Sequence, residues 1–203
     1  MIIDPMFHKD VEFFQRFLRI DGLYRDAING IWYEATEAAA QRFAAGSAAI
    51  LGNEGSFDAR SEQKISTLSL RAQIEARRCL RRLRDASFDA RIISGTRTYA
   101  EQDALFKQGR FGDTRDIVTN AEAGHSNHNF GIAWDIGLFE GRTYITRDEP
   151  YRTAALAGKS AALEWGGDWK SFPDPPHYQL KVGIPVAQVR ELFEAGEGAQ
   201  AFV

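Results

Sequence analysis

The pattern of apolar positions predicts short amphipathic helices in the first fifty residues. Phenylalanine and leucine recur from Val11 to Leu18 with the i, i+3, i+4 spacing of a helix that has one apolar face. Asp21-Gly22 and Asn29-Gly30 are turn signals that interrupt this pattern. A second helix is expected to start near Glu34 and to end by Gly46, because glycine commonly terminates a helix.

The rest of the chain predicts a linker followed by alternating helices and strands. Residues 53–62 are polar and contain glycine, which is typical of a linker. A loop as long as 109–127 is uncommon unless it is functional. The expected elements are a helix over 65–83, a strand over 90–94, a helix over 99–108, a strand over 132–138, a helix over 152–163 and a last strand through Tyr178 and Val182.

The helix expected over 65–83 is rich in arginine, and its arginines allow two interpretations. They could form a solvated helix face, with cations near the carboxyl end where the helix dipole favours them. They could instead contact an anionic polymer of the cell envelope. The residues concerned are Arg71, Arg77, Arg78, Arg81, Arg82 and Arg84.

Composition narrows the class of protein and of partner. The chain has 203 residues, 44% hydrophobic and 26% charged, which is typical of one globular domain or two small ones. A net charge of −3 gives no overall basic field, so we expect no nucleic-acid partner. No apolar run is long enough for a membrane span, and the amino-terminal residues lack the pattern of a secretory signal. We therefore expect synthesis in the cytoplasm without a signal peptide.

The candidate chemistry lies in the last 80 residues, which hold three of the four histidines. Cys79 is the only cysteine, so a metal site would have to use histidine, aspartate and glutamate. Asp135 sits in an apolar strand, where a charge is costly to bury without a partner. Together with His128 and His177 it would complete the ligand set of a catalytic zinc site, with Asp174 as the base.

Spacing alone leaves other interpretations open. The two histidines could be ordinary polar loop residues, and Asp135 could cap a turn. His125, three residues before His128, is a rival ligand. Asp168 competes with Asp174 for the role of base, unless it is a turn carboxylate between Gly167 and Trp169.

Four motifs in the right order resemble a known family. The pattern Ser-x-His-x-x-Gly-x-Ala-x-Asp is matched at every fixed position from Ser126 to Asp135, and Pro176-His177 follows. This resembles the zinc peptidases that cut peptidoglycan stem peptides, which include D-Ala-D-Ala carboxypeptidases, dipeptidases and L-alanyl-D-glutamate endopeptidases. Residues 94–98 resemble the family's Ser-Gly-x-Arg-[Ser/Thr] segment. Residues 164–177 are most similar to the endopeptidase branch of phage endolysins.

The resemblance implies a role for each matching residue. It makes His128, Asp135 and His177 the ligands of one zinc ion per chain. Asp174 matches the catalytic base, and Arg97 matches the arginine that stabilises the oxyanion. Residues expected to line the cleft or contact substrate are Gln102, His125, Ser126 and Trp169.

The amino-terminal segment has a weaker resemblance of its own. Residues 14–18, 21–24 and 30–43 look like the small three-helix peptidoglycan-binding domain, although 25–30 is an insertion and Tyr33 replaces a typical glycine. The alternative is a helical cap packed on the peptidase. The predicted domains are a peptidoglycan-binding-like module over 1–52, a linker over 53–62 and a zinc peptidase domain over 63–203.

These observations combine into one prediction. The expected fold is α+β, a small antiparallel sheet flanked by helices and carrying a zinc site, similar to the hedgehog and D-Ala-D-Ala peptidase fold, after an all-helical module. The expected activity is hydrolysis of the L-Ala–D-Glu bond of peptidoglycan stem peptides by a monomer, released from the cytoplasm to the wall during endolysin-like lysis. The alternatives are a D-Ala-D-Ala carboxypeptidase or dipeptidase, and a non-catalytic zinc-bearing domain that binds the cell wall.

Overall fold

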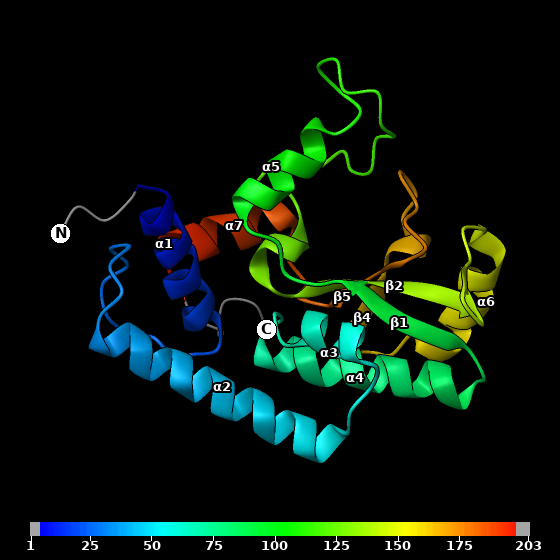
Figure 1. Ribbon diagram of the computed structural model, residues 1–203, viewed down its shortest axis with the longest axis horizontal. Helices are drawn as coiled ribbons and strands as arrows, with labels where there is room; N and C mark the ends of the chain where they lie inside the picture. Colours follow the sequence, from blue (N-terminus) through cyan, green and yellow to red (C-terminus); the bar gives the residue numbers. More distant parts are fainter. Residues whose placement is uncertain (1–4, 198–203) are drawn as a thin grey trace. The chain divides into compact units, whose positions relative to one another are not determined.

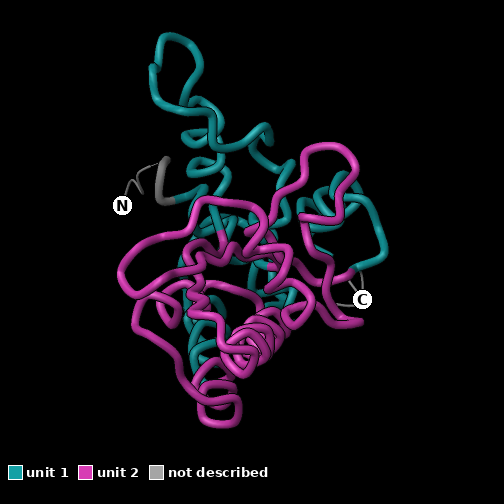
Figure 2. The backbone as a smooth tube through the Cα atoms, turned by 90° about the vertical axis from the view of Figure 1, so that its right-hand side faces the viewer, with its two compact units in different colours: residues 1–45, 97–131, 182–203 teal, residues 46–96, 132–181 magenta. Residues whose placement is uncertain are grey.

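The computed structural model describes residues 5–197, with side chains from His8 onward (Figure 1). The chain forms two compact units, and it passes from one to the other several times (Figure 2). Unit 1 comprises residues 1–45, 97–131 and 182–203, and unit 2 comprises residues 46–96 and 132–181. The predicted module over 1–52 begins, and the predicted domain over 63–203 ends, outside the described residues. This division into domains stays a prediction.

Unit 2 contains an antiparallel sheet, as predicted. Its strand order is β1-β2-β5-β4, and a short strand β3 pairs with β2. The strands are β1 (Asp89–Ser94), β2 (Ala133–Glu140), β3 (Thr143–Tyr144), β4 (Leu163–Trp165) and β5 (His177–Leu180). Because β2 lies between β1 and β5, its residues have partners on both sides. The α+β fold class is confirmed.

Helices of unit 2 pack on this sheet and on one another (Figure 1). They are α3 (Ala59–Ile65), α4 (Leu70–Asp85) and α6 (Asp148–Gly158), and a 3-10 turn η2 (Gly166–Asp168) follows β4. The apolar face of α4 is buried as the sequence predicts, and Cys79 on that face has no exposed surface. Burial raises the pKa of the Cys79 thiol to about 12. This cysteine is therefore a small core residue.

Four of the arginines on α4 hold neighbouring segments of unit 2. The buried Arg77 donates two hydrogen bonds of 2.7 Å to the carboxylate of Glu62 and one of 3.0 Å to the carbonyl of Gly55. Arg78 and Arg81 bind the carboxylate of Glu54, and Arg82 donates to the carbonyl of Gly158. Neither interpretation drawn from the sequence anticipated that three of these cations, Arg77, Arg78 and Arg81, anchor the stretch from Glu54 to Glu62.

Unit 1 is helical in its described part. It contains α1 (Pro5–Ile20), the first half of α2 (Glu34–Glu54), α5 (Tyr99–Lys107), the 3-10 turn η1 (Asn127–Phe130) and α7 (Val186–Ala195). α7 packs against both α1 and η1. The amino-terminal part of unit 1 has a hydrophobic core of Leu18, Tyr24 and Ala39. The partly buried residues packed against this core are Phe14, Leu23, Ile28, Ala35 and Phe43. In residues 5–197, no helix combines the length and the apolar character needed to cross a membrane.

The prediction that the second helix ends by Gly46 is wrong, because α2 continues to Glu54. A Cβ atom at Gly46 would lie only 3.0 Å from the side chain of Leu70. This glycine therefore serves close packing rather than helix termination. Two smaller differences are that α6 ends at Gly158 instead of 163, and that β5 ends at Leu180 instead of Val182.

Candidate metal centre

Asp135 and His177 face each other across the sheet. They are direct partners in the register of β2 and β5, and directly opposed residues of antiparallel strands point to the same face. Nδ1 of His177 lies 3.2 Å from Oδ1 of Asp135. The His177 side chain is 6% exposed and that of Asp135 19%. The costly charge of Asp135 thus has a partner, which the sequence alone could not identify.

The turn that delivers Asp174 and His177 is fixed by backbone hydrogen bonds. The amide of Asp174 donates to the carbonyl of Gly166, and the amide of His177 donates to the carbonyl of Asp174, at 3.0 and 3.1 Å. The indole of Trp165 donates to the carbonyl of Pro175 at 2.8 Å. The two prolines and these bonds together define the turn.

Gly166 has a positioning role that sequence reasoning missed. A Cβ atom at this position would lie 2.5 Å from the carbonyl oxygen of Asp174 and 2.9 Å from Cβ of His177. No side chain fits there without moving the turn. The Gly-Gly pair was visible in the sequence, but the contact that requires it depends on tertiary structure.

His128 comes from a different kind of element, the 3-10 turn η1. The side chain of Ser126 caps this turn by accepting a hydrogen bond from the amide of His128, and Gly131 ends it with φ +68°. Only glycine adopts that backbone region at no cost, which explains the glycine of the motif. The His128 residue is 2% exposed.

The structure brings the three predicted ligands together. Ligand atoms of His128, Asp135 and His177 all lie within 4.8 Å of one another, and this group could hold a metal ion. Donors held about 2.0–2.2 Å from one ion lie no more than about 4.4 Å apart, so this group needs only a small closure around an ion. Two imidazoles and one carboxylate leave a fourth position open, as catalytic zinc sites do. Both the donor types and their spacing therefore fit a zinc ion.

The electrostatics of the cluster favour a cation. Burial lowers the pKa of His177, but the hydrogen bond and negative charge of Asp135 raise it more, so that the net pKa is above its ordinary value. The carboxylate thus stabilises positive charge at this spot. A metal ion would compete with the proton for the imidazole, because a ligating histidine must be neutral.

The predicted catalytic residues lie beside the ligands in the fold. Asp174 is half-buried, three residues before His177. The amide of Arg97 donates to the carbonyl of His128 at 3.1 Å, and the side chain of Asn129 donates to the carbonyl of Arg97 at 2.9 Å. The backbone of Arg97 is therefore fixed to the turn that carries His128.

Gln102, predicted to contact substrate, is fully buried. Its carbonyl oxygen accepts a 2.9 Å hydrogen bond from Nη1 of Arg97, and its amide nitrogen donates to the carbonyl of Ala121 at 2.8 Å. In this arrangement Gln102 holds the guanidinium of Arg97. That second role was not anticipated from the sequence.

The other residues expected to line the cleft have mixed surroundings. The ring of Trp169 lies 4.9 Å from the ring of His177, and the residue is 37% exposed. His125 is exposed, and its Nε2 atom lies 2.7 Å from Nη1 of Arg190. It does not belong to the group of three possible ligands. Ser126 acts as the cap already described.

Comparisons with known proteins show which family this sequence resembles. Residues 119–180 match the family described as D-alanyl-D-alanine carboxypeptidase. The resemblance drawn from the motifs is confirmed. The matched segment contains all three residues of the metal cluster and Asp174.

Two curated relatives carry a more specific name. The chain is 38% identical over 102 residues to the peptidoglycan L-alanyl-D-glutamate endopeptidase CwlK of Bacillus subtilis, covering 45% of this chain and 60% of that protein. It is 27% identical over 127 residues to the L-alanyl-D-glutamate peptidase of Listeria phage A118, covering 61% and 42%. The chain thus spans roughly half the length of these relatives.

One solved structure is also similar. It is the crystal structure of the Serratia marcescens L-Ala D-Glu endopeptidase ChiX, with 27% identity, a TM-score of 0.47, and coverage of 62% of this chain and 89% of that one.

Proposed function

We propose that the protein is a zinc-dependent peptidoglycan endopeptidase that hydrolyses the L-Ala–D-Glu bond of stem peptides. The observation that carries this proposal is the His128–Asp135–His177 cluster, with both histidines buried and a donor set that is that of a catalytic zinc site. The names of the two curated relatives support the choice of bond. The substrate in this proposal is the peptidoglycan of the bacterial cell wall. The enzyme holds one zinc ion per chain.

In this proposal each residue beside the cluster has a chemical task. A zinc ion supplies Lewis-acid polarisation of a carbonyl oxygen and makes hydroxide available at neutral pH. Asp174 accepts the proton of the attacking water and passes it to the leaving amine, a role typically worth about 10²–10⁴-fold in rate. Arg97, held by Gln102, donates to the oxygen on which negative charge develops.

The main alternative is removal of the terminal D-Ala by the same chemistry, and the description of the matching family favours it. Defined stem peptides distinguish the two, because the products differ in mass. The proposal predicts release of the peptide that begins with D-Glu. Release of D-Ala alone would assign the protein to the carboxypeptidase branch. Tight zinc binding without any cleavage would favour a non-catalytic wall-binding domain.

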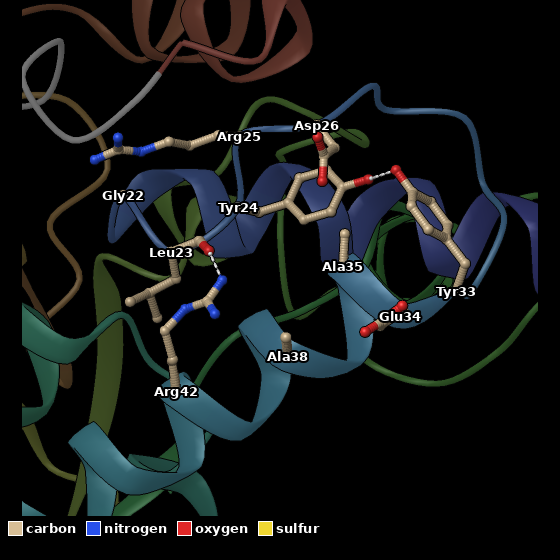
Figure 3. Close-up of a pocket in the computed structure, with 10 residues that line it drawn as sticks. All are labelled: Gly22, Leu23, Tyr24, Arg25, Asp26, Tyr33, Glu34, Ala35, Ala38 and Arg42. Atoms are coloured by element: carbon tan, nitrogen blue, oxygen red, sulfur yellow. Dashed lines mark hydrogen bonds between the residues drawn. The ribbon is translucent and has the colours of Figure 1, made fainter.

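We further propose that the amino-terminal segment, residues 1–52, binds the peptidoglycan polymer. Support comes from a cavity of about 750 Å³, a size typical of ligand sites, on the loop before α2 and on the first turns of α2 (Figure 3). The hydroxyls of Tyr24 and Tyr33 share a 2.8 Å hydrogen bond at its wall, and Arg42 donates to the carbonyl of Leu23 at 2.7 Å.

The chemistry of this cavity suits a polar ligand without a large net charge. Its lining holds two cations and two anions beside the paired tyrosines, and small residues of α2 leave space between them (Figure 3). A chain rich in hydroxyl and amide groups could donate to and accept from such walls. The lining residues are Gly22, Leu23, Tyr24, Arg25, Asp26, Tyr33, Glu34, Ala35, Ala38 and Arg42.

Sedimentation with purified cell walls in chelator tests this second proposal, because cleavage is then suppressed. The full-length double variant Tyr33→Ala/Arg42→Ala should no longer sediment with the cell walls. In a separate assay with zinc, it should cleave soluble stem peptides as the wild type does. Arg84→Ala is a charge-matched control on unit 2, where the arginine is exposed. Equal loss in both variants would mean that binding is a general charge effect, and unchanged binding of the double variant would contradict the proposal.

A further inference from the structure

The second ring nitrogen of His177 has a defined partner that the reaction scheme does not use. Nε2 of His177 lies 3.0 Å from Oε1 of Gln179, while Nδ1 faces Asp135. An amide oxygen only accepts hydrogen bonds, so the contact requires the proton on Nε2. Nδ1 is then the nitrogen on the side of the metal cluster: without a metal it can share a proton with the carboxylate of Asp135, and loss of that proton gives it the lone pair that a metal needs.

The orientation of the Gln179 amide is itself fixed by a third residue. Its Nε2 atom donates to Oε2 of Glu164 at 2.8 Å. A carboxylate accepts and does not donate, so the amide must turn its nitrogen toward Glu164 and its oxygen toward His177. The chain Glu164–Gln179–His177 therefore has one direction, and a reversed amide would break both of its hydrogen bonds.

The backbone holds this chain of side chains in place. Glu164 and Gln179 are direct cross-strand partners on β4 and β5, and Gln179 lies two residues after His177 on the same strand. Residues two apart on a strand share a face. Gln179 is 7% exposed, and burying an amide is costly unless it is hydrogen-bonded. An apolar side chain would suit that position better if packing were its only task.

We propose that Gln179, oriented by Glu164, is a positioning residue that fixes the tautomer of His177, so that Nδ1 is the nitrogen that binds the metal. The inference rests on the proposed metal site, but it concerns metal affinity and not the bond that is cleaved. Partners of this kind orient a histidine ligand, and their loss typically weakens metal binding about 10–100-fold.

The test measures the zinc dissociation constant by competition with a chromophoric chelator. Gln179→Leu should raise this constant about 10–100-fold. Glu164→Gln should raise the constant less. The new glutamine can still accept the hydrogen bond of the Gln179 amide through its oxygen, but it can also donate, so it no longer holds that amide in one orientation. In the Gln179→Leu background, Glu164→Gln should have no further effect, since the two residues act in series.

A swapped pair keeps the test decisive if Gln179→Leu folds poorly. Glu164→Gln/Gln179→Glu places a carboxylate opposite His177 Nε2 and an amide donor behind it. Zinc affinity should return to within a few-fold of the wild type. Gln73→Leu is the matched control, because Gln73 is a fully buried glutamine on α4 that bonds Ser47 and the carbonyl of Leu68. This variant should lose stability and keep its zinc affinity.

The outcomes separate this inference from the proposed function. Wild-type zinc affinity in Gln179→Leu, or independent effects of the two single changes, would overturn the role of Gln179 whatever the enzyme cleaves. Weakened zinc binding in Gln179→Leu would support the inference even if the wild type cut no stem peptide, a result that would overturn the proposed function alone.

Discussion

The two histidines of the metal cluster are held in different ways. His177 lies on a strand, opposite Asp135, and its outer nitrogen contacts a buried amide. His128 lies on a 3-10 turn of four residues whose ends are set by Ser126 and Gly131. On the strand, both ring nitrogens of His177 have a side-chain partner, so the orientation of the ring is fixed. On the turn, His128 is linked to Arg97, because the amide of Arg97 donates a hydrogen bond to the carbonyl of His128.

Substitutions near His177 and substitutions near His128 should therefore have different consequences. Substitutions around His177 should weaken metal affinity, because the sheet holds both His177 and Gln179, the residue that contacts its Nε2 atom. Changes around the turn should act on turnover as well, because the same turn positions the predicted oxyanion residue. The experiments below separate the two effects.

The largest effect is expected from removal of a ligand on either side. His177→Ala and His128→Ala should each lose bound zinc and nearly all activity, because two protein ligands hold the ion poorly. Metal content per chain by elemental analysis, together with stem-peptide cleavage, measures both. If either variant kept a full equivalent of zinc, that histidine would not be a ligand.

Asp174→Ala should slow the chemistry strongly and keep the metal. We expect a loss of about 10²–10⁴-fold in kcat, because a base is removed and no ligand is lost. Asp168→Ala is the matched control, since Asp168 is exposed and forms a 2.5 Å ion pair with Lys159. Loss of zinc from Asp174→Ala would show that the roles of Asp135 and Asp174 had been confused.

On the turn side, Arg97→Ala should lower kcat about 10²–10³-fold with zinc affinity unchanged, as expected for a lost oxyanion donor. Gln102→Leu should lower kcat less, because the guanidinium remains but loses the bond that orients it. Steady-state kinetics beside a zinc titration give the comparison. A large rise in the zinc dissociation constant of Arg97→Ala would mean that the turn serves the metal more than turnover.

The smallest effect on the site is expected from Arg77→Met, on a helix outside both histidine neighbourhoods. Removing one partner of a buried ion pair costs about 3–5 kcal/mol. We expect about 3 kcal/mol of unfolding free energy, at the lower end of that range, because the Glu62 side chain is 24% exposed. Urea unfolding of the metal-free protein measures it, and zinc affinity of the folded protein should not change.

The same ion pair predicts a pH dependence. Burial raises the pKa of Glu62, but the hydrogen bonds from Arg77 and Phe57 lower it more, so that it lies below its ordinary value of 4.5. A lowered folded-state pKa gives stability that is present above the unfolded pKa and is lost as pH falls through the folded one. Glu62→Gln should therefore be less stable than the wild type at pH 7, with a smaller difference in acid. An equal difference at both pH values would exclude this contribution.

The sequence predicted which residues form the candidate metal cluster, but not what surrounds them. Each ligand belongs to a local motif of fixed spacing, so His128, Asp135 and His177 could be selected before any contact was known. Apolar alternation likewise placed the strand that carries Asp135. The partners of these residues lie far away in the chain, and Gln102, Gly166 and Gln179 acquire their roles only through tertiary contacts.

Two errors have the same physical origin. Gly46 has the composition of a helix end, but close packing against Leu70 selects glycine there, and the helix continues. The arginines of α4 look like a solvated face, because their acceptors at Glu54 and Glu62 lie 15 or more residues earlier in the chain. The local sequence pattern shows what kind of residue stands at a position, but the residues it contacts are determined by the tertiary fold.

The dependence of cleavage on zinc is measured by stripping the protein with chelator and restoring zinc stepwise while it acts on muropeptides of known structure. We predict that release of the peptide beginning with D-Glu stops on stripping and returns in proportion to zinc, reaching a plateau at one equivalent per chain. Unchanged release from the metal-free protein would contradict the claim that His128, Asp135 and His177 form a catalytic metal centre.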